Sequence, residues 1–193
     1  MIKKLYYDLE TTGVDVRKHS IHQIAGLIEI GDEVVETFDI KTRPNPKAII
    51  TPEALTVCGV SQETIMSYQP MGSAYKDLIS LMAKYVDRYD KADKFFMVGF
   101  NNSYFDDTFL RAWFEQNNDT FFDAWFFRGS LDVMCLAAEY LIDRRVQMPS
   151  FKLSRVCLEL GIDVDKAKLH DGVYDVELVR QVYRIVTKRE VEL

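Results

Sequence analysis

Three groups of acidic residues are spaced so that they could act together on one cation or substrate. The first pair, Asp8 and Glu10, lies two residues apart in an apolar run that ends at Gly13. Side chains alternate between the faces of a strand, so both carboxylates are predicted on one face. Neighbouring carboxylates repel each other and lose hydration on burial, and a divalent cation offsets both effects. The alternative is a half-exposed strand with a polar face, and the pair alone does not separate the two.

The second acid is Asp106, at the start of a predicted helix that follows a predicted strand. Residues 95–100 are a continuous apolar run, typical of a strand buried on both faces. Ligands of open α/β sheets gather at such strand ends. At helical spacing, Asp106 shares a face with Leu110 and Trp113, which places it over the core. A first-turn acid that interacts with the helix dipole is the alternative interpretation.

The third group is His170 with Asp175. Asp175 precedes Val179 by one helical turn, at the top of the buried face of the last predicted helix. His170 lies five residues earlier, in a predicted loop, and can lean over the same place. A lone histidine is usually an ordinary polar residue, but one just ahead of an inward-facing acid suits general-base catalysis.

The apolar patterns predict a mixed α/β sheet with helices on both faces. Three consecutive antiparallel strands are expected over residues 6–13, 24–30 and 34–40, and a buried strand over 95–100, with 121–127 ambiguous between a short strand and other structure. Helices are expected after Thr51 and Ser61, over 72–89, 104–116 and 132–142, after Ser150 and from about Tyr174.

Length and composition favour one intracellular domain over residues 1–193. No apolar run is long enough for a membrane span, and the N-terminus lacks the pattern of a signal peptide, so we expect a cytoplasmic protein. Cys58, Cys135 and Cys157 show no metal-type spacing and are expected to be reduced core residues. A net charge of −6 argues against coating nucleic acid, but not against an enzyme that grips one chain end.

Together, the three acidic stretches resemble the DEDDh exonucleases, whose fold is ribonuclease-H-like and whose name denotes four acids and a histidine. All five positions match: Asp8, Glu10, Asp106, His170 and Asp175. Residues 50–54 and 59–61 resemble the DNA polymerase III epsilon (proofreading) type, whereas 99–107, 131–134, 149–153 and the region of His170 look closer to bacterial exonuclease I. The resemblance extends from Tyr6 to about Val186. Gly172 departs from it, because the family often has alanine there.

The resemblance implies hydrolysis of single-stranded DNA from the 3′ end, with release of nucleoside 5′-monophosphates. It implies two Mg²⁺ ions, which Mn²⁺ can replace. Asp8 would bridge the ions, Glu10 and Asp175 would bind the first, Asp106 would support the second, and His170 would be the general base. Hydrolysis of short RNA and a proofreading role within a polymerase complex remain alternatives. The expected partners are a DNA (or RNA) 3′ end and a replication or repair polymerase, with no membrane.

Substrate-binding residues cannot be assigned from the sequence. Lys152, Arg155, Arg128 and Arg111 are interpreted as ordinary surface charges, and Tyr7 and Phe105 as core residues rather than base-stacking ones. The chain stops where exonuclease I continues into further domains, so we expect distributive digestion.

Overall fold

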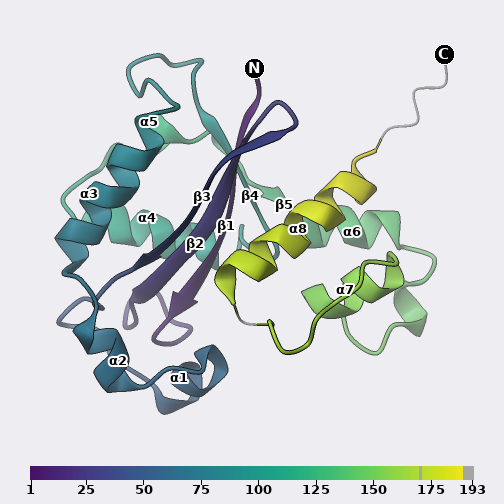
Figure 1. The fold of residues 1–193 in the computed structure, drawn as a ribbon, viewed down its shortest axis with the longest axis horizontal. Helices are drawn as coiled ribbons and strands as arrows, with labels where there is room; N and C mark the ends of the chain where they lie inside the picture. The colour runs from purple at the N-terminus through teal and green to yellow at the C-terminus, as the bar shows by residue number, and fades with distance from the viewer. Residues whose placement is uncertain (170, 189–193) are drawn as a thin grey trace.

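A five-stranded mixed sheet forms the centre of the protein in a computed structural model, which describes residues 1–169 and 171–188. The strands are β1 (Lys3–Thr11), β2 (Ile21–Ile30), β3 (Glu33–Lys41), β4 (Phe95–Gly99) and β5 (Leu131–Asp132), in the order β3-β2-β1-β4-β5 (Figure 1). The pairs β1–β2 and β2–β3 are antiparallel, whereas β1–β4 and β4–β5 are parallel. The expected mixed sheet and its antiparallel N-terminal strands are confirmed.

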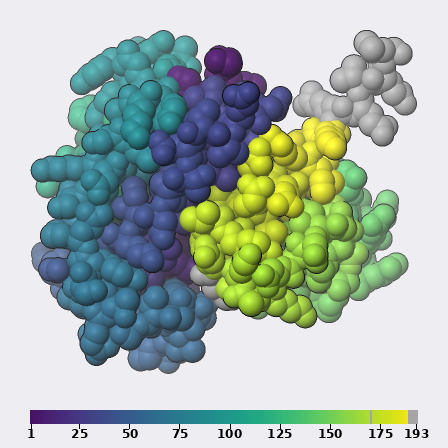
Figure 2. Space-filling view, in the orientation of Figure 1, coloured from purple at the N-terminus to yellow at the C-terminus, as the bar shows by residue number. Residues whose placement is uncertain are grey.

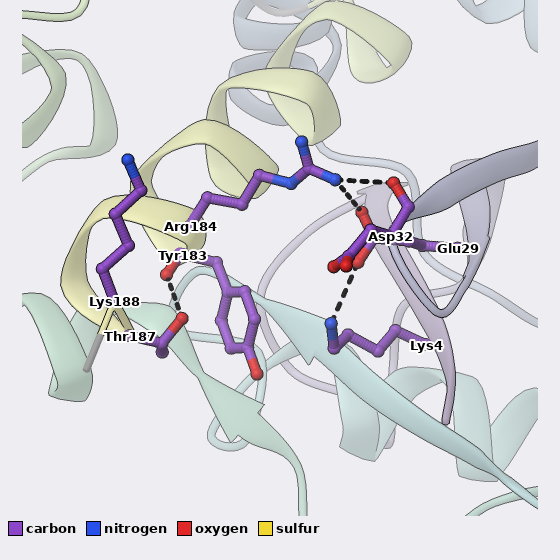
Figure 3. Close-up of a pocket in the computed structure, with 7 residues that line it drawn as sticks. All are labelled: Lys4, Glu29, Asp32, Tyr183, Arg184, Thr187 and Lys188. Carbon is purple, nitrogen blue, oxygen red and sulfur yellow. Dashed lines mark hydrogen bonds and ion pairs between the residues drawn. The ribbon is translucent and has the colours of Figure 1, made fainter. Parts of the chain in front are cut away.

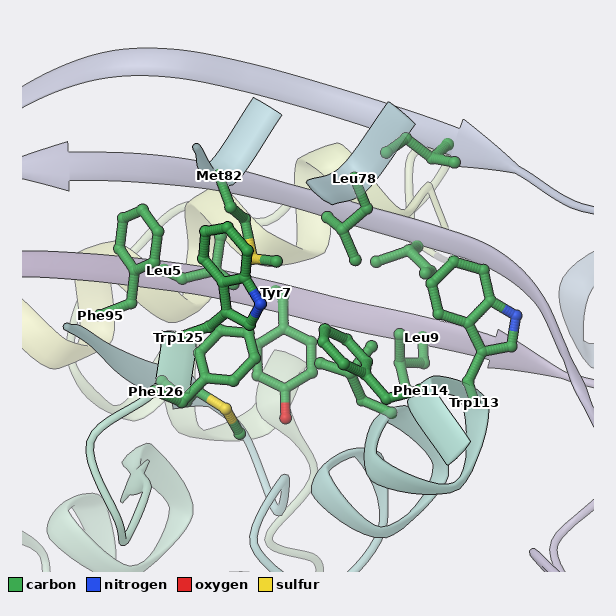
Figure 4. Close-up of a cluster of buried hydrophobic side chains, with 14 of the residues drawn as sticks. Leu5, Tyr7, Leu9, Leu78, Met82, Phe95, Trp113, Phe114, Trp125 and Phe126 are labelled. Atoms are coloured by element: carbon green, nitrogen blue, oxygen red, sulfur yellow. The ribbon is translucent and has the colours of Figure 1, made fainter. Parts of the chain in front are cut away.

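One face of the sheet is covered by α3 (Met71–Met82), α4 (Asp106–Gln116) and α5 (Phe122–Trp125) (Figure 1). Leu5, Tyr7 and Leu9 of β1 join the large aromatic core on this face, and all three are buried. Figure 4 shows them against side chains that include Leu78, Met82, Trp113, Phe114, Trp125 and Phe126. Burial of this many large apolar side chains is the main force that fixes β1 in the middle of the fold.

The other face is covered by α6 (Val133–Tyr140), α7 (Leu153–Glu159) and α8 (Gly172–Val186). Tyr6, Leu27 and Val98 of the sheet pack there against the valines of α8. Figure 2 shows the yellow surface of α8 between the blue strands of the sheet and the green region of α7. Because side chains alternate along β1, Asp8 and Glu10 lie on this second face, after Tyr6.

A buried charge cluster holds α8 to the sheet at the start of β1. Glu29 of β2 is 1% exposed and accepts from Lys4 at 2.9 Å and from Arg184 at 3.2 Å (Figure 3). It also accepts from Arg180 at 2.7 Å. Burial raises the pKa of Glu29, but the donors from Lys4 and Arg180 outweigh it and leave that pKa below its usual value. The pocket beside this cluster lies at the opposite end of β1 from Glu10.

The short helices α1 (Pro52–Cys58) and α2 (Gln62–Ser67) occur where expected, and the Ser61 side chain caps α2. A 3₁₀ turn, η1, covers Arg145–Gln147.

Several boundaries differ from the sequence prediction. The helix expected over 72–89 ends at Met82, and the following turns carry Val86 into the core and leave Tyr89 exposed. The helix expected from Tyr104 begins at Asp106, because the preceding loop is held by Asp132.

The structure resolves one ambiguous stretch and corrects one predicted helix cap. Residues 121–127 contain the helix α5 rather than a strand, because Phe122 and Trp125 reach the core at helical spacing, and Phe126 makes a single parallel bridge to Phe95. Helix α7 is preceded by Lys152 and not by Ser150, and the side chain of Lys152 makes no cap hydrogen bond.

The three cysteines are unpaired, but only Cys157 lies in the core. Cys58 is half-buried and Cys135 is exposed, so two of the three expectations of a core position were wrong. None of the helices within residues 1–169 and 171–188 combines the length and apolar character needed to cross a membrane. The cytoplasmic location expected from the sequence stays a prediction.

Candidate active site

Asp8 and Glu10 lie at the end of β1 and are both partly buried. Removal from water is the largest effect on Asp8 and raises the pKa of its carboxyl well above the usual value. The negative charges of Asp106, Glu10 and Asp175 raise this pKa further. The four acids that matched the DEDDh pattern therefore interact electrostatically around Asp8, although residues 8, 106 and 175 are far apart in the chain.

Asp106 reaches this place because the loop that follows β4, the neighbour of β1, leads directly into α4. Its side chain is 6% exposed, and its Oδ1 accepts a hydrogen bond from the Leu9 backbone N at 3.2 Å. Burial raises the pKa of Asp106 to about 7, although backbone N–H donors at Asp106 and Leu9 act in the opposite direction. An acid of the first helical turn thus points at the strand that carries Asp8 and Glu10.

Asp175 is placed by the first turn of α8, which rests directly on β2. The Asp171 side chain caps this helix by accepting from the N–H groups of Val173 at 3.1 Å and Tyr174 at 3.3 Å. A Cβ atom at Gly172 would lie 2.6 Å from Cβ of Ala25, too close for two carbon atoms. Glycine at position 172 therefore allows α8 to approach the sheet closely. His170 lies outside the described residues.

Two acids that the sequence analysis did not assign hold the loop before α4. Asp132 accepts from the backbone N of Asn101 at 2.9 Å and from Ser103 Oγ at 2.7 Å, while it also caps α6. Asp107 accepts from the hydroxyls of Tyr7 and Ser130.

These contacts fasten the start of α4 to β1 and to the segment before β5. The sequence shows two adjacent acids, Asp106 and Asp107. Neighbouring helix positions point in different directions, so Asp106 faces the candidate site while Asp107 binds Tyr7 and Ser130.

Helix α1 is attached to the end of β1 at both of its own ends. At its start, both the N–H and the Oγ1 of Thr51 donate to the carbonyl of Thr12, just beyond β1. Cys58, the last residue of α1, donates its thiol to Oε2 of Glu10 at 2.8 Å. Burial, together with the neighbouring Glu10 carboxylate, raises the pKa of the Cys58 thiol well above its usual value. The thiol is therefore protonated and able to donate. Sequence spacing gave no signal for this contact.

A groove of about 460 Å³ opens next to Cys58. Its walls include Gln23 and Lys41 from the sheet, Gly59 after α1, and Asp171 before α8. It thus lies on the sheet face that carries Glu10, between the end of α1 and the start of α8.

The donor chemistry of the acids suits a hard divalent cation, because carboxylate oxygens are the ligands that Mg²⁺ prefers. The buried, mutually repelling charges around Asp8 are also the situation that a cation would relieve. Within the described part of the chain, however, no three acidic, histidine or cysteine side chains form a ready-made metal cluster. Asp106 is turned to the backbone of Leu9, and one oxygen of Glu10 to Cys58.

Three of the basic side chains interpreted as surface charges form ion pairs. Arg111 and Arg128 both pair with Asp123, at 2.8 and 3.1 Å, and Arg155 pairs with Glu159. Tyr7 is 2% exposed and Phe105 packs against the aromatic core, which agrees with their interpretation as core residues. Tyr104, two residues before Asp106, is 82% exposed and was not considered from the sequence.

The sheet order and the helices on both faces are those of a ribonuclease-H-like fold. The exonuclease family model RNase_T matches residues 5–183, so the chain belongs to this family of nucleases. The expected relationship to the DEDDh 3′–5′ exonucleases is confirmed.

Individual relatives agree with this assignment. The chain is 24% identical to DNA polymerase III subunit epsilon of Pasteurella multocida (strain Pm70) over 99% of its own length and 70% of that protein. Escherichia coli exonuclease I in complex with a dT13 oligonucleotide has the same fold, with a TM-score of 0.79 and 20% identity over 98% of this chain. A zinc-bound exonuclease I–single-stranded DNA complex gives a TM-score of 0.80, 20% identity and 100% coverage of this chain. The chain spans about 42% of the length of either exonuclease I structure.

Proposed function

We propose that this protein hydrolyses single-stranded DNA from its 3′ end and releases nucleoside 5′-monophosphates. The observation that carries the proposal is the electrostatic interaction of Asp8 with Glu10, Asp106 and Asp175 at the end of β1. Membership of the exonuclease family supports the reaction class, and an exonuclease I structure in complex with dT13 supports the substrate. We further propose that residues 1–193 act as one exonuclease domain.

In this proposal, Asp8, Glu10, Asp106 and Asp175 would hold two Mg²⁺ ions, with Mn²⁺ as a substitute. When bound, these ions would lower the pKa of a water molecule and stabilise charge on the attacking and leaving oxygens. Asp8 is central because its carboxyl interacts with the other three acids. The raised pKa of the Asp8 carboxyl in the absence of cations indicates that its ionised form requires a compensating positive charge.

His170 is proposed as the general base that takes a proton from the attacking water. It comes directly before Asp171, the residue that caps α8. Its assignment rests on the matched sequence pattern.

The likeness to DNA polymerase III subunit epsilon supports a second candidate role, as a proofreading subunit bound to a polymerase. This role requires the same active site and adds a protein partner. Copurification of the tagged chain with a polymerase from its own source would support it, and a chain that elutes alone while degrading DNA would argue for independent action.

The function is tested with single-stranded DNA labelled at the 3′ or 5′ end, duplex DNA and RNA, each incubated with Mg²⁺. Immediate release of the 3′ label as a mononucleotide, with stepwise shortening of the 5′-labelled strand, is the expected result. Faster cleavage of RNA than of DNA would replace the DNA assignment with the exoribonuclease alternative.

The matched variants are Asp8→Asn and Asp77→Asn. Asp8→Asn keeps the side-chain shape but removes the charge that interacts with the other three acids, so turnover should fall by at least the ~10²-fold typical of losing a catalytic group. Asp77 is an exposed acid of α3, where it accepts a hydrogen bond from Gln69, and its variant should retain activity. A folded Asp8→Asn protein with wild-type turnover would show that the proposed site is wrong.

A further inference from the structure

Cys58 makes a side-chain contact that the proposed mechanism leaves without a role. Its Sγ lies 2.8 Å from Oε2 of Glu10, and the two residues are 48 positions apart in the chain. The other end of α1 is also fixed in place, because the backbone N–H and the Oγ1 of Thr51 both donate hydrogen bonds to the carbonyl of Thr12. Both ends of this short helix are thus attached to the last residues of β1 or to those just after it.

A hydrogen bond to a carboxylate restricts how that carboxylate can rotate. Such partners of metal-binding residues orient the ligand and maintain its affinity, and their removal costs about 10–100-fold in affinity or activity. A thiol is a weak donor, so it can fix an orientation without competing strongly with a cation for the same carboxylate. Glu10 needs such orientation, because its negative charge is close to those of Asp8 and Asp106.

We propose that Cys58 is a positioning residue, whose thiol holds the Glu10 carboxylate in the orientation in which it binds a divalent cation. The inference rests on the proposed function, in which Glu10 is a cation ligand. In this proposal Cys58 acts through the Glu10 carboxylate and takes no direct part in the reaction. Its replacement should therefore change the concentration of metal that the enzyme needs and leave the Michaelis constant for DNA unchanged.

The test compares wild type, Cys58→Ala and Cys58→Ser, with Cys135→Ala as the control at an exposed cysteine on α6. Mn²⁺ affinity is obtained by fitting the rise in melting temperature with Mn²⁺ concentration to the mass-action relation, without DNA. The Mg²⁺ requirement is then measured from activity at saturating DNA. Circular dichroism establishes that each variant is folded.

Cys58→Ala should need about 10-fold more Mn²⁺ for the same rise in melting temperature and about 10-fold more Mg²⁺ for half-maximal activity. Cys58→Ser keeps an O–H donor and should recover most of the affinity, while Cys135→Ala should match wild type. Wild-type metal affinity in Cys58→Ala would overturn the inference, and so would a serine variant as weak as the alanine one, because that result would indicate packing rather than hydrogen bonding. A wild-type chain that binds no Mn²⁺ and degrades no DNA would instead overturn the proposed function, and this inference with it.

Discussion

His22, a single residue outside the candidate site, makes the stability of the protein sensitive to acid. It lies on β2 with no exposed surface, and neither ring nitrogen has a hydrogen-bond partner among the described residues. Burial lowers the pKa of His22 to about 4. The unfolded chain takes up this proton near pH 6.5, so it binds more protons than the folded chain between pH 4 and 6.5.

We therefore predict that His22 lowers the free energy of unfolding progressively as pH falls from about 6.5 to about 4, by up to about 3 kcal/mol. Replacing it in His22→Leu should remove this dependence. Urea unfolding of both proteins at pH 7 and pH 5 measures the effect as a difference. The carboxyl groups of the candidate site contribute equally to both proteins, so their effect cancels in this difference. Their raised pKa values increase stability as pH falls, opposite to the effect of His22. An equal loss of stability in the two proteins between pH 7 and 5 would contradict the prediction.

Among the elements, α8 depends on one close contact for its position. Gly172 and Ala25 leave no room for another carbon atom, and Asp175 follows one turn later. The cluster around Glu29 fastens the helix farther along, through Arg180 and Arg184. A change at Gly172 should therefore tilt the first turn of α8 away from the sheet while the rest of the helix stays in place.

We predict that Gly172→Ala lowers both activity and stability, because the added methyl group would meet Ala25. Overpacking of a buried contact typically costs about 1–3 kcal/mol. The double variant Gly172→Ala with Ala25→Gly moves the methyl group to the other side of the contact and should restore much of both losses. Melting temperature and turnover of the two single variants and the double variant form the measurement, and purely additive effects would disprove a direct steric conflict.

The sequence was sufficient for the parts of the site that depend on local periodicity. Strand alternation placed Asp8 and Glu10 on one face, and helical spacing placed Asp106 over the core. It was not sufficient for contacts that depend on how separate elements pack, such as the thiol of Cys58 on Glu10. The end of α3 was missed for the same reason, because Val86 is drawn into the core by tertiary packing that interrupts a favourable helical pattern.

At the scale of the whole molecule, charge limits how the protein holds nucleic acid. The chain has 24 Lys and Arg residues against 30 Asp and Glu. Several of the basic side chains are already paired, including Arg111, Arg128, Arg155 and Arg180. Affinity for nucleic acid of any sequence grows with the number of phosphates that Lys and Arg neutralise. Few such contacts are expected here beyond the candidate site.

We therefore predict distributive digestion, in which the chain by itself dissociates after one or a few nucleotides. Labelled single-stranded DNA is loaded first, and the reaction is started with Mg²⁺ together with a large excess of unlabelled DNA. Labelled strands should shorten by only a few nucleotides under these conditions. Long runs of release from each labelled strand would show that other contacts hold the DNA.

The order of the sheet also has a consequence for synthesis of the chain. Asp8 and Glu10 are made first, whereas Asp175 comes from the last described helix, and the acids meet only when α8 closes over the second face of the sheet. At about 5–20 residues per second, roughly 10 to 30 seconds separate the translation of Asp8 from that of Asp175. During this interval the growing chain carries an incomplete catalytic set. We therefore expect the ribosome-bound chain to have no nuclease activity on nearby messenger RNA or DNA until α8 has emerged.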